Sequence, residues 1–249
     1  MTKKAIAIIQ ARMESSRLPN KSLLPLSGKP IIAHVIERAK SIQGISTILA
    51  VPKTKPNDVL KKIADEYQID FFQGSETNVL DRYYNAAINY DCDYVMRITG
   101  DNPFTDVQFA AATLEMAVKE NADICSPENL PLGTAVEVIS MTSLKTAHQE
   151  ADLPYQLEHV SPFIKENPQR FKIFKFNAGL KFSIENLRLT IDTPEDLEFA
   201  QIISQNLYKG APYPVVDIIN FLETNSQLLL INSQIKQRSM THYEKTNAI

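Results

Sequence analysis

The stretch IIQARMESSRLPNKSLLPLSGKP, from Ile8 to Pro30, joins the end of an apolar run to the start of a helical pattern. Its first residues complete the buried-strand pattern AIAIIQ, and Pro30 suits the first turn of a helix. Between them lies a basic, hydroxyl-bearing loop with a single acid, Glu14. A strand, a loop and a helix form the first unit of an α/β fold, so this stretch indicates the fold class.

The same alternation continues along the chain. Apolar runs bounded by turn residues predict buried strands, and amphipathic runs between them predict helices. Strands are expected over residues 5–10, 46–52, 69–74, 93–99, 122–127, 135–141, 171–178 and 187–192, and helices over 30–41, 57–68, 78–90, 106–122, 154–167, 193–207 and 215–223. This order predicts an α/β fold with a mainly parallel mixed sheet and helices on both faces.

No linker, repeat or low-complexity stretch divides the chain, so a single α/β domain is expected over residues 1–212. Residues 213–249 are interpreted as a C-terminal extension, helical at first and then apolar, with a polar end that is expected to fray. In the helix expected over 78–90, apolar residues recur around Tyr83 at helical spacing, which predicts that Arg82 lies on a different face.

The composition is that of an ordinary globular protein, with 44% hydrophobic residues, 22% charged residues and a net charge of −3. This balance argues against a protein that binds nucleic acid or membrane surfaces, so an anion site must be a local concentration of positive charge. No apolar run reaches the roughly 18 residues that span a bilayer, and the N-terminal run is too short for a signal peptide. Cys92 and Cys125 lack metal-like spacing and suit a reducing compartment. A soluble, cytoplasmic protein is expected.

The loop after the first strand suits a nucleoside triphosphate. Arginine side chains grip phosphate oxygens in pairs, lysine adds a mobile charge, and hydroxyl and backbone N–H groups complete the cradle. No glycine precedes Gly28, so the motif is neither a P-loop nor a dinucleotide fingerprint. The alternative is an ordinary solvated basic loop. The residues that carry the prediction are Arg12, Ser15, Ser16, Arg17 and Lys21.

Two aspartates follow predicted strands. Asp101 comes after RITG and Asp192 after RLTI, so both are expected at the carboxyl edge of the sheet, where ligands of open α/β folds bind. Two carboxylates facing a triphosphate suit Mg²⁺, which binds one or two carboxylates together with phosphate oxygens. The alternatives are a turn aspartate before Pro103 and the start of a helix capped by Thr193. The helix-cap interpretation leaves Asp192 free for another role.

Six motifs follow one another between Ile6 and Phe199. They are QARMESSRLPNKSLLPLSGKP, FQGSETNVLDRY, RITGDNPF, GTAVEV, EHVSPFI and RLTIDTPEDL. Together they resemble the acylneuraminate and 3-deoxy-manno-octulosonate cytidylyltransferases, closest to the branch of spore-coat polysaccharide biosynthesis protein F. The resemblance implies a Rossmann-like nucleotide-diphospho-sugar transferase fold. It also implies a homodimer that converts CTP and a small acidic sugar to a CMP-sugar and pyrophosphate with Mg²⁺, for surface polysaccharide synthesis.

The resemblance also implies roles for individual residues. It implies that the catalytic residues are Arg12, Arg17, Lys21 and Asp101. It implies that the nucleotide is bound by these four residues and by Ala11, Ser15, Ser16, Gly74, Ser75 and Asn78, of which the last three lie near cytosine. It also implies that the metal is bound by Asp101 and Asp192. The acceptor side is expected to include Arg97, Gly133, Thr134, Glu137, Glu158 and His159, and His159 also fits a packed helix histidine. Asn20 stands where the family usually has glycine, a mild departure because asparagine tolerates a left-handed conformation.

Three other interpretations remain open. A glycosyltransferase of similar architecture would need a metal-binding Asp-x-Asp after a strand, whereas Asp91-Cys92-Asp93 precedes one. A uridylyl- or guanylyltransferase would be expected to have a glycine-rich opening loop. A non-catalytic nucleotide-binding protein could keep the fold and lose the two aspartates, whereas this sequence has both of them. The mechanism expected for the cytidylyltransferase is attack of an acceptor oxygen on the α-phosphorus of CTP, without a covalent enzyme intermediate.

Overall fold

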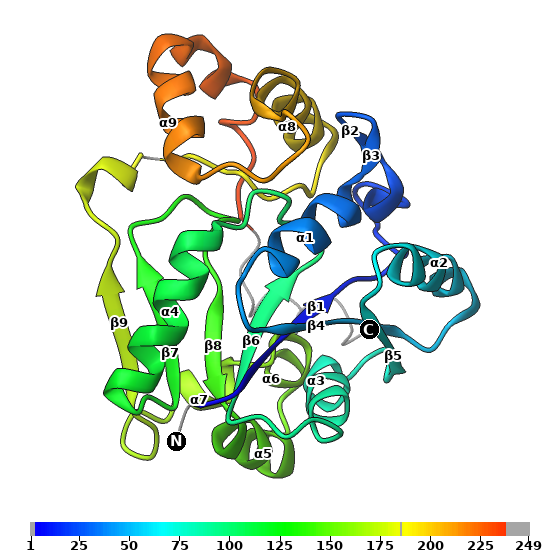
Figure 1. Cartoon of the computed structure of the whole chain (residues 1–249), viewed down its shortest axis with the longest axis vertical. Coiled ribbons are helices and arrows are strands. Elements are labelled where there is room, and N and C mark those ends of the chain that lie inside the picture. Colours follow the sequence, from blue (N-terminus) through cyan, green and yellow to red (C-terminus); the bar gives the residue numbers. More distant parts are fainter. Residues whose placement is uncertain (1–2, 185, 238–249) are drawn as a thin grey trace, which may run out of the picture.

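The computed structural model describes residues 3–184 and 186–237, and a seven-stranded sheet forms its centre (Figure 1). The strands are β1 (Ala5–Gln10), β4 (Ser46–Pro52), β5 (Asp70–Gly74), β6 (Tyr94–Thr99), β7 (Ile124–Glu128), β8 (Glu137–Ser140) and β9 (Ile173–Asn177). Their order is β5-β4-β1-β6-β8-β7-β9. β8 runs antiparallel to both neighbours, and the other pairings are parallel. The predicted mainly parallel mixed sheet is confirmed.

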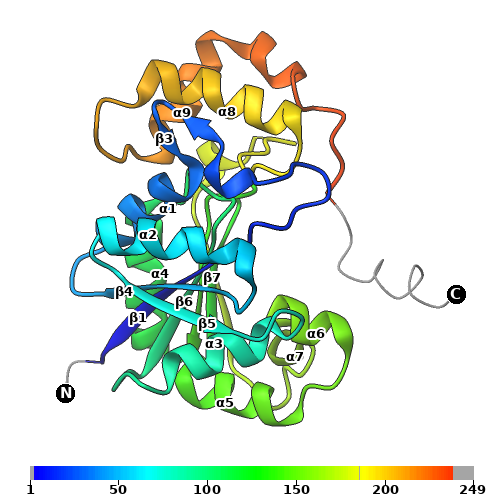
Figure 2. The same ribbon diagram turned by 90° about the vertical axis from the view of Figure 1, so that its right-hand side faces the viewer.

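Helices cover both faces of the sheet, as predicted (Figure 2). They are α1 (Ile31–Lys40), α2 (Asp58–Glu66), α3 (Val79–Ala87), α4 (Val107–Glu120), α5 (Met141–Glu150), α6 (Pro154–His159), α7 (Pro162–Lys165), α8 (Pro194–Leu207) and α9 (Val215–Thr224). Residues of α1, α2 and α4 pack on one face, and residues of α3, α5, α6 and α7 on the other. No helix in the described part of the chain has the length and apolar character needed to cross a membrane.

β1 shows why the first strand is apolar throughout. Ile6 and Ile8 belong to the core cluster on one face of the sheet, and Ala7 and Ile9 to the cluster on the other face. A strand that is covered on both sides needs apolar residues at consecutive positions, because successive side chains point to opposite faces. β1 is an interior strand between β4 and β6, and the loop that follows it leaves from the carboxyl edge of the sheet.

α8 and α9 lie beyond that edge (Figure 1), and a third core cluster packs under them. It joins Leu187, Leu189 and Ile191 to α8 and to the residues from Tyr213 onward. The antiparallel pair β2 (Pro25–Leu26) and β3 (Lys29–Pro30) lies beside α8, and short 3₁₀ helices span Lys21–Leu23, Lys55–Asn57, Leu180–Phe182 and Ser226–Leu230. The polar end of the extension, with its expected fraying, falls outside the described residues.

Two of the predicted elements are wrong. The single helix expected over 154–167 is two short helices, α6 and α7, because Val160 has a φ of 70° and Pro162 has no N–H for the helical ladder. The strand expected over 187–192 is an irregular segment outside the sheet, and one isolated bridge joins its Arg188 to Leu132 in the loop before β8. An alternating apolar pattern indicates that a segment is buried, but it does not show what the segment packs against. This segment is buried against loops and helices instead of strands.

Two further features differ from expectation. α5 has no signal in the sequence pattern, because its buried residues are only Ser143, Leu144 and Ala147. The helical pattern predicts Arg82 on a different face of α3 from the apolar residues, yet it is 2% exposed. Its side chain turns back under the segment before α3, where Nη1 donates to the carbonyl of Ser75. A helical wheel cannot show such a contact, because it depends on a segment that comes before the helix.

Candidate active site

The loops after β1 and β6 meet at the carboxyl edge of the sheet. Gln10 pairs with Thr99 at the ends of the two strands, and the N–H of Gly100 then donates to the carbonyl of Gln10 at 2.7 Å. A Cβ on Gly100 would lie 2.8 Å from the Cβ of Ala11, so only glycine allows this approach. The chain passes from β1 to β4 on one side and returns to β6 on the other. This reversal of strand order is where open α/β sheets bind ligands.

The basic loop is anchored at this edge. The N–H of Met13 donates at 2.8 Å to the side chain of Asn57, which is fully buried, and Ser22 Oγ donates to the carbonyl of Arg12. Asn20 has a φ of 56°, the left-handed conformation expected of it, and begins the 3₁₀ turn that carries Lys21. Arg12 and Ser16 are exposed, and Ser15 and Arg17 are partly exposed. The loop is held at several points, and its polar side chains remain at the surface.

Lys21 joins the two predicted aspartates. Its Nζ lies 2.7 Å from Asp101 Oδ2 and 2.9 Å from Asp192 Oδ1, and it also donates to the carbonyl of Ile191 at 3.1 Å. The N–H of Ile191 in turn donates to the carbonyl of Asp101 at 2.9 Å. The predicted convergence of the basic loop and the two aspartates on one edge is therefore confirmed, although the segment before Asp192 is not a strand.

Three cations surround Asp192. Besides Lys21, Arg17 Nη2 lies 3.3 Å and Arg188 Nη2 2.7 Å from Asp192 Oδ2. Burial raises the pKa of Asp192, but these cations outweigh burial and hold the pKa below its ordinary value. Burial lowers the pKa of Lys21, but the negative charges of Asp101 and Asp192 raise it by more, so the pKa of Lys21 lies above its ordinary value. Both groups are charged at neutral pH.

The segment predicted to lie near cytosine connects β5 to α3. Gly74 ends β5, Ser75 Oγ accepts the N–H of Asn78 at 3.1 Å, and the Asn78 side chain accepts the N–H of Asp81 at 2.8 Å as the N-cap of α3. Among the described residues, Arg82 Nε is buried without a hydrogen-bond partner. Sequence reasoning missed Arg82, which supports this segment from below through Ser75.

Residues predicted for the acceptor side gather between β6, β8 and the short helices. Arg97 and Glu137 are paired across β6 and β8, with Arg97 Nη1 3.2 Å from Glu137 Oε2. Lys165, which the sequence analysis did not single out, contacts the other carboxylate oxygen. Burial raises the pKa of Glu137, but Arg97 and Lys165 outweigh it and lower the pKa overall.

His159 and Glu158 end α6 beside this group, and both are partly exposed. Burial lowers the pKa of His159, and Glu158 opposes this effect while Arg97 and Arg12 reinforce it. The charges of Arg12 and Arg97 therefore reach the imidazole from two different parts of the sheet edge. His159, predicted for the acceptor side, is therefore within electrostatic reach of Arg12 in the basic loop.

Gly133 and Thr134 have packing roles. Gly133 has a φ of 93°, and a Cβ there would lie 2.5 Å from the backbone nitrogen of Thr190. Thr134 is fully buried, and its hydroxyl donates to the carbonyl of Pro131 at 2.8 Å. The two residues let the loop before β8 lie directly against the segment that carries Asp192.

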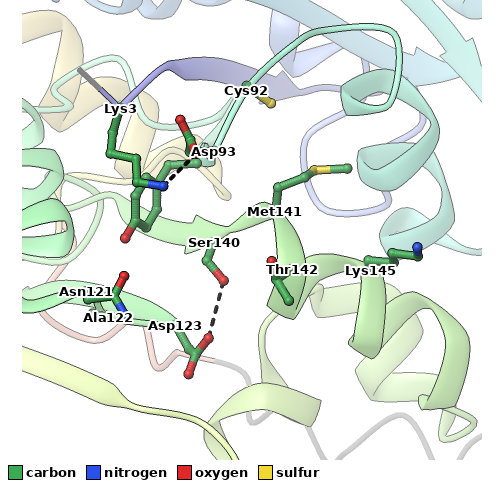
Figure 3. A pocket seen from close by; sticks show the side chains of 11 residues that line it. Lys3, Cys92, Asp93, Asn121, Ala122, Asp123, Ser140, Met141, Thr142 and Lys145 are labelled. Carbon is green, nitrogen blue, oxygen red and sulfur yellow. Dashed lines mark hydrogen bonds and ion pairs between the residues drawn. The ribbon is translucent and has the colours of Figure 1, made fainter. Parts of the chain in front are cut away.

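The opposite edge of the sheet holds a cavity of about 520 Å³ (Figure 3). Lys3 pairs there with Asp93 at 2.8 Å, and Ser140 Oγ donates to Asp123 at 3.3 Å. Asp91 pairs with Lys4 at the same edge. The Asp-x-Asp string thus lies away from the carboxyl edge, as predicted, and the residues that line the cavity include none of those predicted to bind nucleotide, metal or acceptor.

The two aspartates meet the minimum requirement for Mg²⁺. Across residues 3–184 and 186–237, no group of three or more His, Cys, Asp or Glu side chains could hold a metal ion. However, one ammonium contacts both Asp101 and Asp192, so one small cation can also reach both. Mg²⁺ commonly binds with one or two carboxylates and completes its shell with phosphate oxygens and water. The donor set fits a metal that arrives with a nucleotide.

Comparison with known proteins identifies related sequences over almost the whole chain. An uncharacterised protein of Methanocaldococcus jannaschii is 37% identical, over 97% of this chain and 100% of its own length. The spore coat polysaccharide biosynthesis protein SpsF of Bacillus subtilis is 29% identical, over 88% of this chain and 93% of its own.

Solved structures share the fold. A cytidylyltransferase from Leptospira borgpetersenii superposes with a TM-score of 0.85 at 25% identity, over 96% of this chain and 100% of that one. A CMP:2-keto-3-deoxy-manno-octonic acid synthetase complexed with CTP has a TM-score of 0.63 at 18% identity, over 82% and 100%. The family model described as cytidylyltransferase matches residues 6–213, which include the basic loop and both aspartates. The chain belongs to the cytidylyltransferase family.

Proposed function

We propose that the protein transfers CMP from CTP to a small acidic sugar or related acceptor, releasing pyrophosphate, with Mg²⁺ as its cofactor. The proposal places this reaction in the cytoplasm, in a homodimer that serves surface-glycan synthesis. The observation that carries it is the contact of Lys21 with both Asp101 and Asp192, beside the anchored basic loop. Family membership adds the nucleotide, because it is the family of cytidylyltransferases.

The reaction we propose is a direct displacement at the α-phosphorus. An acceptor oxygen forms the new bond to phosphorus as the bond from phosphorus to the bridging oxygen of the β-phosphate breaks, and pyrophosphate leaves with that oxygen. Arg12, Arg17 and Lys21 neutralise the triphosphate and the departing pyrophosphate, which is how such transfers are mainly accelerated. Asp101 and Asp192 would hold Mg²⁺, which would supply Lewis-acid polarisation of a phosphate oxygen when bound.

The base site in this proposal lies on the segment between β5 and α3. Gly74, Ser75 and Asn78 stand near cytosine together with the backbone of Ala11. The hydrogen bonds of Ser75 and Asn78 hold this segment in one shape before nucleotide arrives. Such preorganisation suits the recognition of an exocyclic amine, since a carbonyl at that place leaves the site's own groups unpaired.

The acceptor site in this proposal is the group formed by Arg97, Glu137, Lys165, Glu158 and His159. Arg97 and Lys165 share one carboxylate, Glu137, and Arg12 adds a further positive charge within electrostatic reach. Glu137 and Glu158 balance Arg97 and Lys165, so the positive charge that Arg12 adds is the part that favours an acidic acceptor. An acidic sugar also occurs in the name of one structural neighbour, the CMP:2-keto-3-deoxy-manno-octonic acid synthetase.

The proposal is tested with the purified protein and the four nucleoside triphosphates. With Mg²⁺ present, CTP should raise the unfolding temperature more than UTP, GTP or ATP, and pyrophosphate should appear when a keto-sugar acid is added. A larger shift with another nucleotide would contradict the cytidylyl assignment. Binding of CTP without pyrophosphate release across a panel of acceptors would favour a non-catalytic nucleotide-binding protein, and release of a nucleoside diphosphate from a nucleotide-sugar would favour a glycosyltransferase.

A further inference from the structure

Asp192 lies on a segment that the sheet does not hold. Residues 187–192 form no strand of the sheet, and their backbone–backbone hydrogen bonds to other segments of the described chain go to Leu132 and to the carbonyl of Asp101. A carboxylate that must keep one direction on such a segment needs support from side chains. The side chain in the best position to give it is Arg188, four residues before Asp192.

We propose that Arg188 is a positioning residue that fixes the direction of Asp192, and that the segment after α9 completes this support through Asn232. The inference rests on the proposed function, since it concerns the aspartate to which that function gives a role. Arg188 is 4% exposed, and its side chain contacts Asp192, Asp196 and Gln237. It acts only through the carboxylates that it contacts.

The guanidinium of Arg188 links two carboxylates of different kinds. Its Nη2 donates to Asp192 Oδ2 at 2.7 Å, and its Nε donates to Asp196 Oδ1 at 2.9 Å. Asp192 lies at the edge with Lys21, whereas the Asp196 side chain is fully buried. The planar fork of arginine holds both at once, which a lysine ammonium on a flexible stem does not reproduce.

Asp196 fixes the backbone that carries Asp192. Its Oδ2 accepts the N–H of Asp192 at 3.0 Å and the N–H of Thr193 at 3.2 Å, as part of the capping box that begins α8. Arg188 therefore holds the Asp192 side chain directly and its backbone through Asp196. The result leaves Asp192 Oδ1 directed at Lys21, on the side where the nucleotide is proposed to bind.

The C-terminal segment supports Arg188 in turn. Asn232 is 4% exposed, and its Nδ2 donates to the carbonyl of Arg188 at 3.1 Å and to Asp196 Oδ1 at 3.0 Å. Arg188 Nη1 also donates to the side chain of Gln237. Residues beyond the 6–213 span matched by the family model thus hold a group that contacts the candidate site.

The experiment compares Arg188→Lys and Asn232→Ala with the unchanged protein. CTP affinity is measured by calorimetry with Mg²⁺ and with EDTA, and kcat and KM for CTP are measured by pyrophosphate release. In Arg188→Lys, the gain in CTP affinity that Mg²⁺ provides should fall by about 10-fold, and kcat should fall similarly, as for other groups that orient metal ligands. Affinity in EDTA should change by less than about 2-fold, whereas KM for CTP, which is measured with Mg²⁺, should rise with the lost affinity. Asn232→Ala should show the same pattern with a loss of about 3-fold.

Arg38→Lys is the matched control. Arg38 is also 4% exposed, but it donates to the backbone carbonyls of Pro103, Thr105 and Tyr213. This variant should lower the unfolding temperature without changing the gain from Mg²⁺. If Arg188→Lys is folded at the assay temperature and keeps both the full gain in CTP affinity from Mg²⁺ and the full kcat, the proposal is wrong. If Arg188→Lys does not fold, Asn232→Ala is judged by the same two measurements. If the unchanged protein shows no gain in CTP affinity from Mg²⁺ and releases no pyrophosphate, the proposed function and this inference are both wrong. If only this inference is wrong, the unchanged protein still shows the gain from Mg²⁺ and the release of pyrophosphate.

Discussion

At the scale of single residues, Lys21 contacts the two carboxylates that we propose for the metal. One ammonium between Asp101 and Asp192 lowers the repulsion between them in a site where the Lys21 side chain is only 14% exposed. A triphosphate brings about four negative charges and competes for the same ammonium. When Lys21 turns to the phosphates, the carboxylates lose their cation, and a divalent ion can take its place. Lys21 would therefore couple nucleotide binding to metal binding.

This coupling predicts a gain of function from Lys21→Ala. Without nucleotide, the variant should bind Mn²⁺ more tightly than the unchanged protein by about 10-fold or more, because the competing positive charge has been removed. Metal-free binding of CTP should weaken at the same time. Titration with Mn²⁺, followed by its electron paramagnetic resonance signal, measures the first effect, and calorimetry with CTP in EDTA measures the second.

Lys29→Ala is the control for this prediction. Lys29 contacts Glu37 and Tyr208 away from the candidate site, so its loss frees one carboxylate instead of two. We expect no tighter binding of Mn²⁺ in that variant. Equal Mn²⁺ affinity in Lys21→Ala and the unchanged protein would mean that Asp101 and Asp192 do not form a cation site.

At the scale of elements, the sequence predicts best where a strand or helix is decided by its own residues. β1 follows from its continuous apolar run and α3 from its helical periodicity, because β1 is covered on both faces and α3 on one. The predicted cap of α8 is confirmed, since the Thr193 hydroxyl accepts the N–H of Asp196. The segment before Asp192 could not be predicted in this way, because its apolar residues pack in the third core cluster and its backbone partners are loops.

The pairing of β6 with β8 leads to a prediction about pH. Glu137 joins the two strands through Arg97 and joins α7 through Lys165, and its pKa lies below its ordinary value. A lowered pKa in the folded state contributes stability above the unfolded pKa, which is lost as the pH falls through the folded value. Glu137→Gln should therefore cost about 3 kcal/mol at pH 7, because two cations lose their buried partner. The cost should shrink below about pH 4.

Unfolding in urea at pH 7, 5 and 3.5 measures this difference. Glu115→Gln is the control, since Glu115 is exposed on α4, and its substitution should change the free energy of unfolding by less than about 0.5 kcal/mol at each pH. A cost for Glu137→Gln that stays constant over this range would show that Glu137 contributes by packing and not by its charge.

At the scale of the whole molecule, the prediction of the site depends on how well the sequence indicates contacts between distant segments. Lys21 and Asp101 could be predicted together, because both follow strands that end at one edge of a parallel sheet. Asp192 was placed correctly for a partly wrong reason, since its segment reaches that edge outside the sheet. Arg82 and Arg188 gave no signal, because an arginine within an apolar pattern looks like a surface residue until its partners are known.

The same long-range arrangement gives a prediction about Asp101 and Asp192. Asparagine is nearly isosteric with aspartate and still forms turn hydrogen bonds, but it lacks the charge that Mg²⁺ needs. If the two residues were only turn and cap residues, Asp101→Asn and Asp192→Asn would be close to neutral. As metal ligands, each should cost on the order of 10²-fold in kcat, comparable to the loss of one preorganised transition-state contact. Rates of pyrophosphate release at saturating CTP and Mg²⁺ provide the measurement.

The double variant tests whether the two carboxylates share one ion. Once one ligand has been lost, the second has little left to contribute, so the combined loss should be much smaller than the product of the single losses. Asp93→Asn is the control, because Asp93 pairs with Lys3 at the opposite edge and should leave kcat unchanged within about 2-fold. Additive losses for Asp101→Asn and Asp192→Asn would mean that the carboxylates act separately. The contact of both with Lys21 would then be an ion-pair network that positions the basic loop, and the metal would need another site.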